Sequence, residues 1–180
     1  MRITTWAEYG LICSVHLARR IEQGPITGRE VAAKERLPAD YVEQILLRLR
    51  RAGIVRSTRG ARGGYVLDRA PDQISVRQII QASELATFEL HCVTHPVEEA
   101  RCSDAHACSI RPVWQMLQRR IDDVLEGVRL SDLLHEEPVV RERVGLGGLA
   151  PSEPVADLVP AGVGAAEPLT GRRGLPVLEL

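Results

Sequence analysis

The pattern of apolar positions between residues 37 and 68 predicts an amphipathic helix followed by a β-hairpin. Pro38 suits the first turn of a helix, and Gly53 follows the end of the helical period. Two short strands, residues 54–58 and 65–67, then flank a tip rich in arginine and glycine. The apolar stripe of the helix recurs every three or four residues and consists of Val42, Ile45, Leu46 and Leu49. A helix followed by such a hairpin is the layout of a winged helix-turn-helix.

Two earlier segments supply the other helices of such a domain. A first helix begins at Thr4 or Thr5, either of which can cap it, and runs to about Ile21. Thr27 and Glu30 have the spacing of a capping box, which predicts the start of a second helix. The residues of this second helix expected to face inward are Val31, Ala32 and Ala33. The turn at residues 37–38 then joins it to the following helix as a helix-turn-helix.

A short helix closes the amino-terminal domain after the hairpin. Ser75 is its expected cap, and it extends from residue 76 to about residue 84. Its inward-facing residues are Val76, Ile79 and Ile80. We therefore assign residues 1–84 to a winged helix-turn-helix domain that binds DNA.

A strong helical period returns at Ser109 and continues for about five turns. Its apolar positions are Ile110, Val113, Trp114, Leu117, Ile121, Val124, Leu125 and Val128. An apolar face of this length needs a partner, so residues 109–135 are interpreted as a dimerisation helix with a short terminal turn. The alternative is a helix that folds back on its own domain. The expected fold class is mostly α with a small β-hairpin wing: a winged helix-turn-helix domain plus a long dimerisation helix.

The remaining residues carry no regular period. Residues 136–180 are rich in proline and glycine, which predicts a disordered tail. Residues 85–108 hold three of the four cysteines and three histidines, and a segment of this length without a period usually has a function or is disordered. We interpret residues 85–108 as a cysteine-containing loop that holds a metal cluster.

The charges of the chain are distributed unevenly. Residues 1–88 contain 14 basic and 9 acidic residues, a net charge of +5, whereas residues 89–180 contain 9 and 15, a net charge of −6. Seven arginines lie between residues 48 and 69, where Asp68 is the one acid. A phosphate backbone favours such a cluster through counterion release. The alternative is a solvated basic face with no ligand.

These features predict which residues contact DNA. The start of the third helix would enter the major groove, and its reading candidates are Ala39, Asp40, Tyr41, Gln44 and Arg48. Phosphate contacts are expected from Thr27 and Arg29 at the second helix. The wing would lie in or beside the minor groove. Its expected contacts are Arg56, Ser57, Arg59, Arg62, Gly63 and Gly64. The expected ligand is double-stranded DNA with a near-palindromic operator.

Several other classes of protein are disfavoured by the sequence. No apolar run reaches the length of a membrane span, and no export signal is visible, which favours the cytoplasm. A Gly-rich nucleotide loop, a Ser–His–Asp order and a paired-carboxylate site are all missing, so we do not expect an enzyme. Cysteines in a cytoplasmic chain are not expected to form structural disulfides.

The spacing of three cysteines, Cys-x9-Cys-x5-Cys, indicates a metal site at Cys92, Cys102 and Cys108. Soft thiolate ligands suit either zinc or an iron–sulfur cluster. Zinc ribbons and fingers use close cysteine pairs, which this spacing lacks. A fourth ligand from a histidine, a carboxylate, water or a second chain would complete the site. Zinc and a thiol redox switch remain alternatives.

The chain resembles the IscR/NsrR/RirA-type family of bacterial winged-helix transcriptional regulators. The matching pieces are MRITTWAEYGL, then YVEQILLRLRRAGIVRSTRGARGGYVLDRA, and three cysteines before a long helix. The likeness covers roughly residues 1–135. It implies a homodimeric regulator whose affinity for DNA depends on an iron–sulfur cluster held by the three cysteines.

The resemblance also suggests the fourth ligand. The IscR-like pattern places a histidine three residues after the last cysteine, where this chain has Arg111. The NsrR-like pattern uses an acidic residue near the amino terminus of the partner subunit, where this chain has Glu8. This favours an NsrR-like site of Glu8 and three cysteines with a 4Fe–4S cluster. A 2Fe–2S cluster with a histidine ligand stays open.

The implied function is that of a homodimeric DNA-binding regulator, and a repressor is the favoured form. Its cluster would sense nitric oxide, redox state or iron. The rivals are a cluster-free thiol-switch or zinc-dependent regulator and, from a different class, an iron–sulfur electron-transfer protein.

Overall fold

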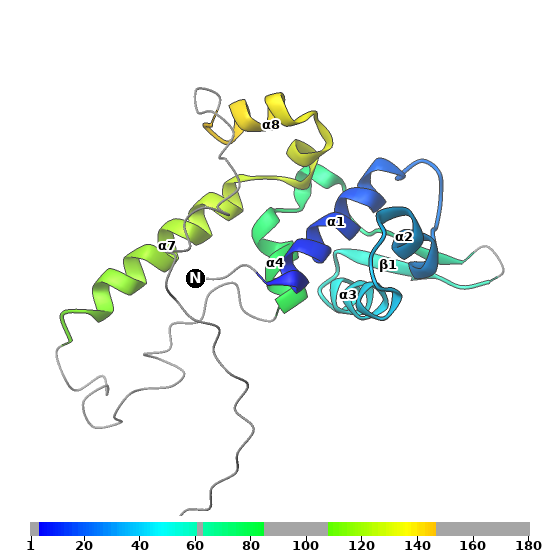
Figure 1. Cartoon of the computed structure of the whole chain (residues 1–180), viewed down its shortest axis with the longest axis horizontal. Coiled ribbons are helices and arrows are strands. Elements are labelled where there is room, and N and C mark those ends of the chain that lie inside the picture. Colours follow the sequence, from blue (N-terminus) through cyan, green and yellow to red (C-terminus); the bar gives the residue numbers. More distant parts are fainter. Residues whose placement is uncertain (1–3, 61–62, 85–107, 147–180) are drawn as a thin grey trace, which may run out of the picture. The chain divides into compact units, whose positions relative to one another are not determined.

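The structure, a computed structural model, describes residues 4–60, 63–84 and 108–146 (Figure 1). The chain divides into two units, Met1–Gly147 and Gly148–Leu180, and all the described residues belong to the first. The predicted DNA contact Arg62 and the predicted metal ligands Cys92 and Cys102 lie outside the described residues, as does the tail beyond residue 146. The described elements are mostly helical and include a two-stranded hairpin, which confirms the predicted fold class.

The three predicted helices of the helix-turn-helix are present. They are α1 (Thr5–Arg19), α2 (Gly28–Glu35) and α3 (Ala39–Arg51). Helix α1 ends two residues before Ile21, and Pro38 caps α3 in an extended conformation instead of lying in its first turn. Thr27 and Glu30 form the predicted capping box of α2.

One predicted inward position of α2 is wrong. Val31 and Ala32 are buried, but Ala33 is exposed, because three consecutive helical positions turn too far to share one face.

The predicted wing is an antiparallel hairpin of β1 (Val55–Thr58) and β2 (Gly64–Leu67). The linker before α2 also joins it, because the backbones of Ile26 and Tyr65 exchange two hydrogen bonds, of 3.1 and 2.8 Å. Gly64 lies so close to the backbone of Ile26 that a side chain there would clash with it. The linker therefore holds the tip-proximal half of β2 against the helix-turn-helix.

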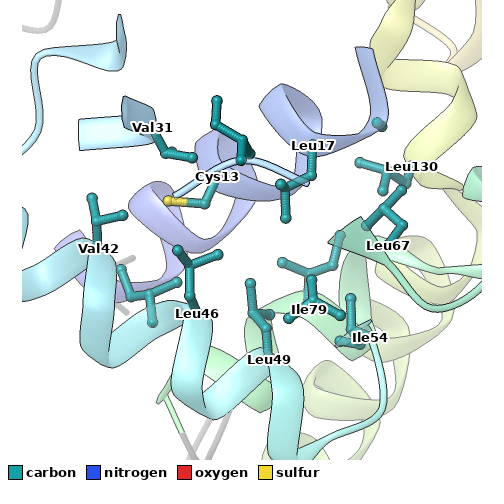
Figure 2. Packing of buried hydrophobic residues seen from close by; sticks show 14 of the residues in the cluster. Cys13, Leu17, Val31, Val42, Leu46, Leu49, Ile54, Leu67, Ile79 and Leu130 are labelled. Carbon is teal, nitrogen blue, oxygen red and sulfur yellow. The ribbon is translucent and has the colours of Figure 1, made fainter. Parts of the chain in front are cut away.

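The core lies between α1, α3 and the helix that follows the wing. A single 3₁₀ turn, η1 (Pro71–Gln73), leads into α4 (Val76–Glu84), which packs against both α1 and α3. Ser75 accepts a hydrogen bond from the backbone N–H of Gln78, which confirms its predicted role as the cap of α4. Figure 2 shows the packing, with Cys13 of α1 among Val31, Val42 and Leu46. The stripe predicted for α3 is fully buried there.

The second half of the described chain consists of α7 (Arg111–Gly127), the 3₁₀ turn η2 (Leu130–Leu134) and α8 (Glu137–Arg143). The carboxyl end of α7 is attached to the first domain, because Leu125 and Val128 pack beside Ala7, Val76 and Ile80. A backbone bridge between Ser75 and Arg129 reinforces this attachment. Leu130 is fully buried in the core of the first domain.

Helix α8 corrects the predicted tail, which was to begin at residue 136. Pro138 lies in the first turn of α8, where a missing N–H costs nothing, and Gly145 (φ 78°) follows its end. Arg143 forms an ion pair of 2.6 Å with Asp132 of η2. These local signals outweigh the content of glycine and proline that predicted disorder for residues 137–146.

Among the described residues, no helix has both the length and the apolar character needed to cross a membrane.

Candidate nucleic-acid interface

The exposed side of α3 carries four of the five predicted reading residues. Ala39, Asp40, Tyr41 and Gln44 are all exposed at the amino-terminal half of the helix. The opposite side is the buried stripe, so α3 cannot rotate without exposing its core positions. The packing of α3 thus fixes which side chains face outward. Such a rigid helix with polar side chains at one end suits the major groove.

Arg48 is the exception among the predicted readers. It is half-buried, its guanidinium lies 4.1 Å from the centre of the Trp6 ring, and its Nη1 donates a hydrogen bond of 2.5 Å to the carbonyl oxygen of Ser83. The same indole contacts the Tyr41 ring, with centroids 4.8 Å apart and planes tilted by 37°. Arg48 therefore contacts α1 and α4, whereas the other four predicted reading residues are exposed.

The start of α2 is organised by its own cap. The Thr27 hydroxyl donates to the Glu30 carboxylate at 2.7 Å and accepts from the Glu30 backbone N–H at 3.2 Å. The backbone N–H of Thr27, which donates to the Glu30 carboxylate at 2.9 Å, and then the Thr27 hydroxyl hold the pKa of Glu30 below its usual value. Because the Thr27 hydroxyl hydrogen is already used, Arg29, which is exposed, is the better placed of the two for a phosphate.

The wing presents basic and small residues to solvent. Arg56, Ser57, Arg59 and Gly60 are exposed, and Gly63 and Gly64 are half-buried behind them. Arg56 approaches Asp68 at 3.6 Å, but both side chains are largely exposed, so this ion pair stabilises the fold little. A side chain at Gly63 would clash with the carbonyl oxygen of Thr58, which explains the glycine at this tight turn. The arginines therefore remain available for a phosphate backbone.

Three further residues belong to this face and were not among the predicted contacts, namely Trp6, Glu43 and Tyr65. Glu43 is exposed on α3, lies against Gly28, and accepts a hydrogen bond of 3.5 Å from the Tyr65 hydroxyl of the wing. Burial, and then the Glu43 charge, raises the pKa of Tyr65. The position of Glu43 between the exposed residues Tyr41 and Gln44 was a signal for it. Nothing local in the sequence connects Trp6 to α3, because that contact is tertiary.

The predicted metal ligands are only partly described. Glu8 is exposed on α1, and Cys108 is exposed just before α7. Within the described ranges, no three Cys, His, Asp or Glu side chains form a group that could hold a metal ion. The fourth cysteine is of a different kind: Cys13 is fully buried, and burial, with a smaller effect from Glu35, raises its pKa to about 12. Cys13 lies within the apolar core cluster, with no access for a metal ion, so it is not a candidate ligand.

Helix α7 exposes most of its apolar residues. None of its side chains is buried, and Val124 is 66% and Trp114 41% exposed. The other large apolar side chains exposed on or beside it are Ile110, Val113, Met116 and Leu117. Only its carboxyl end packs on α4, where Arg77 and Asp122 also form an ion pair of 3.2 Å. Exposed apolar faces of this kind are typical of interaction surfaces.

Known proteins are similar to this chain in sequence. The sequence pattern of the Rrf2 family, described as "Iron-dependent Transcriptional regulator", matches residues 3–136. A protein of Synechocystis sp. named "Putative HTH-type transcriptional regulator slr0846" is 35% identical over 136 residues, which is 76% of this chain and 89% of that protein.

Solved structures of known regulators are also similar to this chain. The T. potens IscR structure is 30% identical with a TM-score of 0.59, covering 74% of this chain and 86% of that one. The structure of CymR, named as the global cysteine regulator of B. subtilis, is 31% identical with a TM-score of 0.59, covering 74% of this chain and 96% of that one.

Proposed function

This chain belongs to the Rrf2 family of transcriptional regulators, and on that premise we propose that it is a homodimeric repressor whose affinity for its operator is set by an iron–sulfur cluster. Members of this family bind DNA and are generally dimers, and their named relatives are regulators rather than enzymes. The observation that carries the DNA-binding half is the rigid exposed end of α3 beside the arginine-rich wing. We place its action in the cytoplasm.

The proposed DNA contacts follow from exposure. Asp40, Tyr41 and Gln44 read base edges in the major groove, and Ala39 contacts a thymine methyl group. Arg29, together with the cap residue Thr27, approaches a phosphate at the start of α2. The wing lies at the minor groove through Arg56, Ser57, Arg59, Arg62, Gly63 and Gly64. Two copies related by a twofold axis then require a near-palindromic operator.

The exposed face of α7 supports a dimer of this chain. Most of its large apolar side chains are exposed in the described part of the chain, and its carboxyl end and the following turn are fixed to the DNA-binding domain through Leu125, Val128 and Leu130. Two copies that pair along α7 would hold their α3 helices at a set separation. That separation determines which half-site spacing the dimer can bind.

The proposed cluster ligands are Cys92, Cys102, Cys108 and the partner's Glu8. The two ligands that the structure describes suit this role, because both are exposed and neither belongs to the core. Thiolates bind iron tightly, whereas a carboxylate is a harder ligand and forms the more exchangeable bond. The cluster supplies sensitivity to nitric oxide, oxygen or iron supply.

The favoured subtype is NsrR-like with a 4Fe–4S cluster, since Arg111 occupies the position of the IscR-like histidine. A 2Fe–2S cluster with a histidine ligand is the second form. In both forms, Cys108 connects the metal site to the start of α7, and Glu8 connects it to α1. Loss of the cluster can therefore alter the geometry of the two reading helices.

Anaerobic purification tests the cluster. We expect a coloured protein containing iron and sulfide, and loss of both in a variant with Cys92, Cys102 and Cys108 all replaced by serine. Glu8→Ala should keep the colour but lose the cluster faster under nitric oxide. The matched control is Cys13→Ala, which removes a thiol that the structure excludes as a ligand and should retain the cluster. A colourless protein with bound zinc, or one whose DNA affinity follows thiol oxidation alone, would contradict the proposal.

A further inference from the structure

We propose that Arg48 is a positioning residue that links the reading helix to the carboxyl end of α4, and that it transmits the state of the cysteine-containing segment to DNA affinity. The inference rests on the proposed function above and deepens it. It assigns to a residue of the reading helix a role other than DNA contact.

Arg48 joins three helices at one point. It extends from α3, its guanidinium stacks on Trp6 of α1, and its Nη1 donates to the carbonyl oxygen of Ser83 in α4. Ser83 is in the last turn of α4, where backbone carbonyls have no partner within the helix. A cation is stabilised at this end of a helix, and its hydrogen bond satisfies one of those carbonyls. Arg48 thus has a structural role at the carboxyl end of α4.

The end of α4 is also held by α1. The Glu84 carboxylate accepts hydrogen bonds from the backbone N–H of Thr4, at 3.2 Å, and from its hydroxyl. Helix α1 approaches α4 so closely at Gly10 that a side chain there would clash with Ser83. The last two residues of α4 therefore contact both α1 and α3. The cysteine-containing segment begins at the next residue, so this junction is the described part of the fold that adjoins it along the chain.

The junction reaches the reading surface directly. Trp6 contacts both Arg48 and Tyr41, and Tyr9 adds an edge contact with Tyr41 at 6.1 Å. Tyr41 is exposed at the reading end of α3. A shift of α4 that moves Arg48 would alter the support of Trp6 and hence the orientation of Tyr41. Glu8 lies on α1 between Trp6 and Tyr9, so a ligand bond at Glu8 would act on the same aromatic group.

The experiment compares the affinity for an operator duplex, selected in vitro with the wild-type protein, in the cluster-loaded and chelator-stripped full-length dimer. Couplings of this kind change affinity by about 5- to 150-fold. We expect wild type to show a ratio in this range and Arg48→Gln to bring it close to one. Arg48→Lys, which keeps a donor but loses the planar stack, should restore part of the ratio. Trp6→Leu removes the same junction from α1 and should also reduce the ratio.

Salt dependence separates positioning from DNA contact. Loss of one phosphate contact lowers the slope of log K against log salt by about 0.9. Arg48→Gln should leave this slope unchanged. The matched control is Arg51→Gln, an exposed arginine one turn further along α3, which should lower the slope or leave it unchanged but keep the wild-type ratio.

Three outcomes would overturn the inference. The first is an unchanged ratio in both Arg48→Gln and Trp6→Leu while wild type retains its coupling, which would leave the proposed function standing. The second is a lower salt slope in Arg48→Gln, which would make Arg48 a phosphate contact. The third is a wild-type ratio of one, which would refute the sensor function as well. Far-ultraviolet circular dichroism and thermal unfolding of each variant confirm that the fold is intact.

Discussion

Helices α3 and α7 carry the same kind of apolar period but use it in different ways. Every apolar stripe residue of α3 is fully buried, from Val42 to Leu49. Helix α7 is longer and has no buried residue at all, although Leu125 near its end packs on α4. The period of a sequence thus predicts an apolar face. It does not show whether the same domain covers that face.

The difference separates two sources of stability. The face of α3 stabilises a single folded chain, whereas the face of α7 can be stabilised only by contact with a further surface. Mutations on the two helices should therefore change different measurable quantities. Those on α3 should alter the free energy of unfolding, and those on α7 the dissociation constant of the dimer.

The largest effect is expected from truncating the stripe of α3. Leu46→Ala removes a side chain with 0% exposure and leaves a cavity, which should lower the free energy of unfolding by about 2–5 kcal/mol. Val124→Ala on α7, measured as a diluted monomer, is the matched control and should change it by less than about 0.5 kcal/mol. Urea unfolding curves for both variants give the comparison. Equal losses would show that α7 is packed in its own subunit.

The next effect concerns association through α7. Trp114→Ala removes a large aromatic side chain that is 41% exposed in the single chain. If two copies meet there, buried aromatic residues of this kind contribute about 2 kcal/mol or more, so the dimer should dissociate at least about 30-fold more readily. Analytical ultracentrifugation measures this. A dimer of unchanged affinity in Trp114→Ala and in Leu117→Ala would move the interface away from α7.

These two helices also show how far the sequence is informative. The capping box at Thr27 and Glu30, the stripe of α3 and the hairpin after it are local patterns, and the sequence predicted each of them. The contact of Arg48 with Trp6 and Ser83 was not predictable, because it joins residues 42 and 35 positions apart. Helical spacing predicts that Arg48 lies on the exposed face of α3, but its contacts with other helices leave it half-buried. Helix α8 differs from the predicted disorder because its first-turn proline and terminal glycine are local helix signals that outweigh the composition of the segment.

The two described cysteines extend the comparison to reactivity. Burial raises the pKa of Cys13, beside α3, to about 12 from an ordinary value of 9.0, whereas Cys108, before α7, is exposed. In the cluster-free native protein at pH 8, iodoacetamide should therefore modify Cys108 and spare Cys13, since the thiolate is the nucleophile. Mass spectrometry after digestion identifies the modified thiol. Equal labelling of Cys13 without denaturant would show that the core opens.

The same pKa makes stability depend on pH. The folded state holds the Cys13 proton more tightly than the unfolded state, so its stabilisation is complete below pH 9.0 and is lost as the pH rises toward about 12. The loss should be about 1.4 kcal/mol per pH unit within that window. Cys13→Ala should remove this slope. Urea unfolding at pH 8, 9 and 10 provides the measurement, and a slope unchanged by the substitution would contradict the assignment.

The smallest effect compares the charged surfaces of the two regions. Arg59 on the wing and Arg119 on α7 are both exposed arginines, but only the wing is placed at the proposed DNA surface. Arg59→Gln should lower the slope of log K against log salt by about 0.9 for every duplex sequence, because a phosphate contact carries no base information. Arg119→Gln should leave it unchanged, since net charge alone does not release counterions bound at a distant phosphate. Equal reductions in the two variants would mean that α7 also follows the DNA backbone, and the division between a reading surface and an association surface would fail.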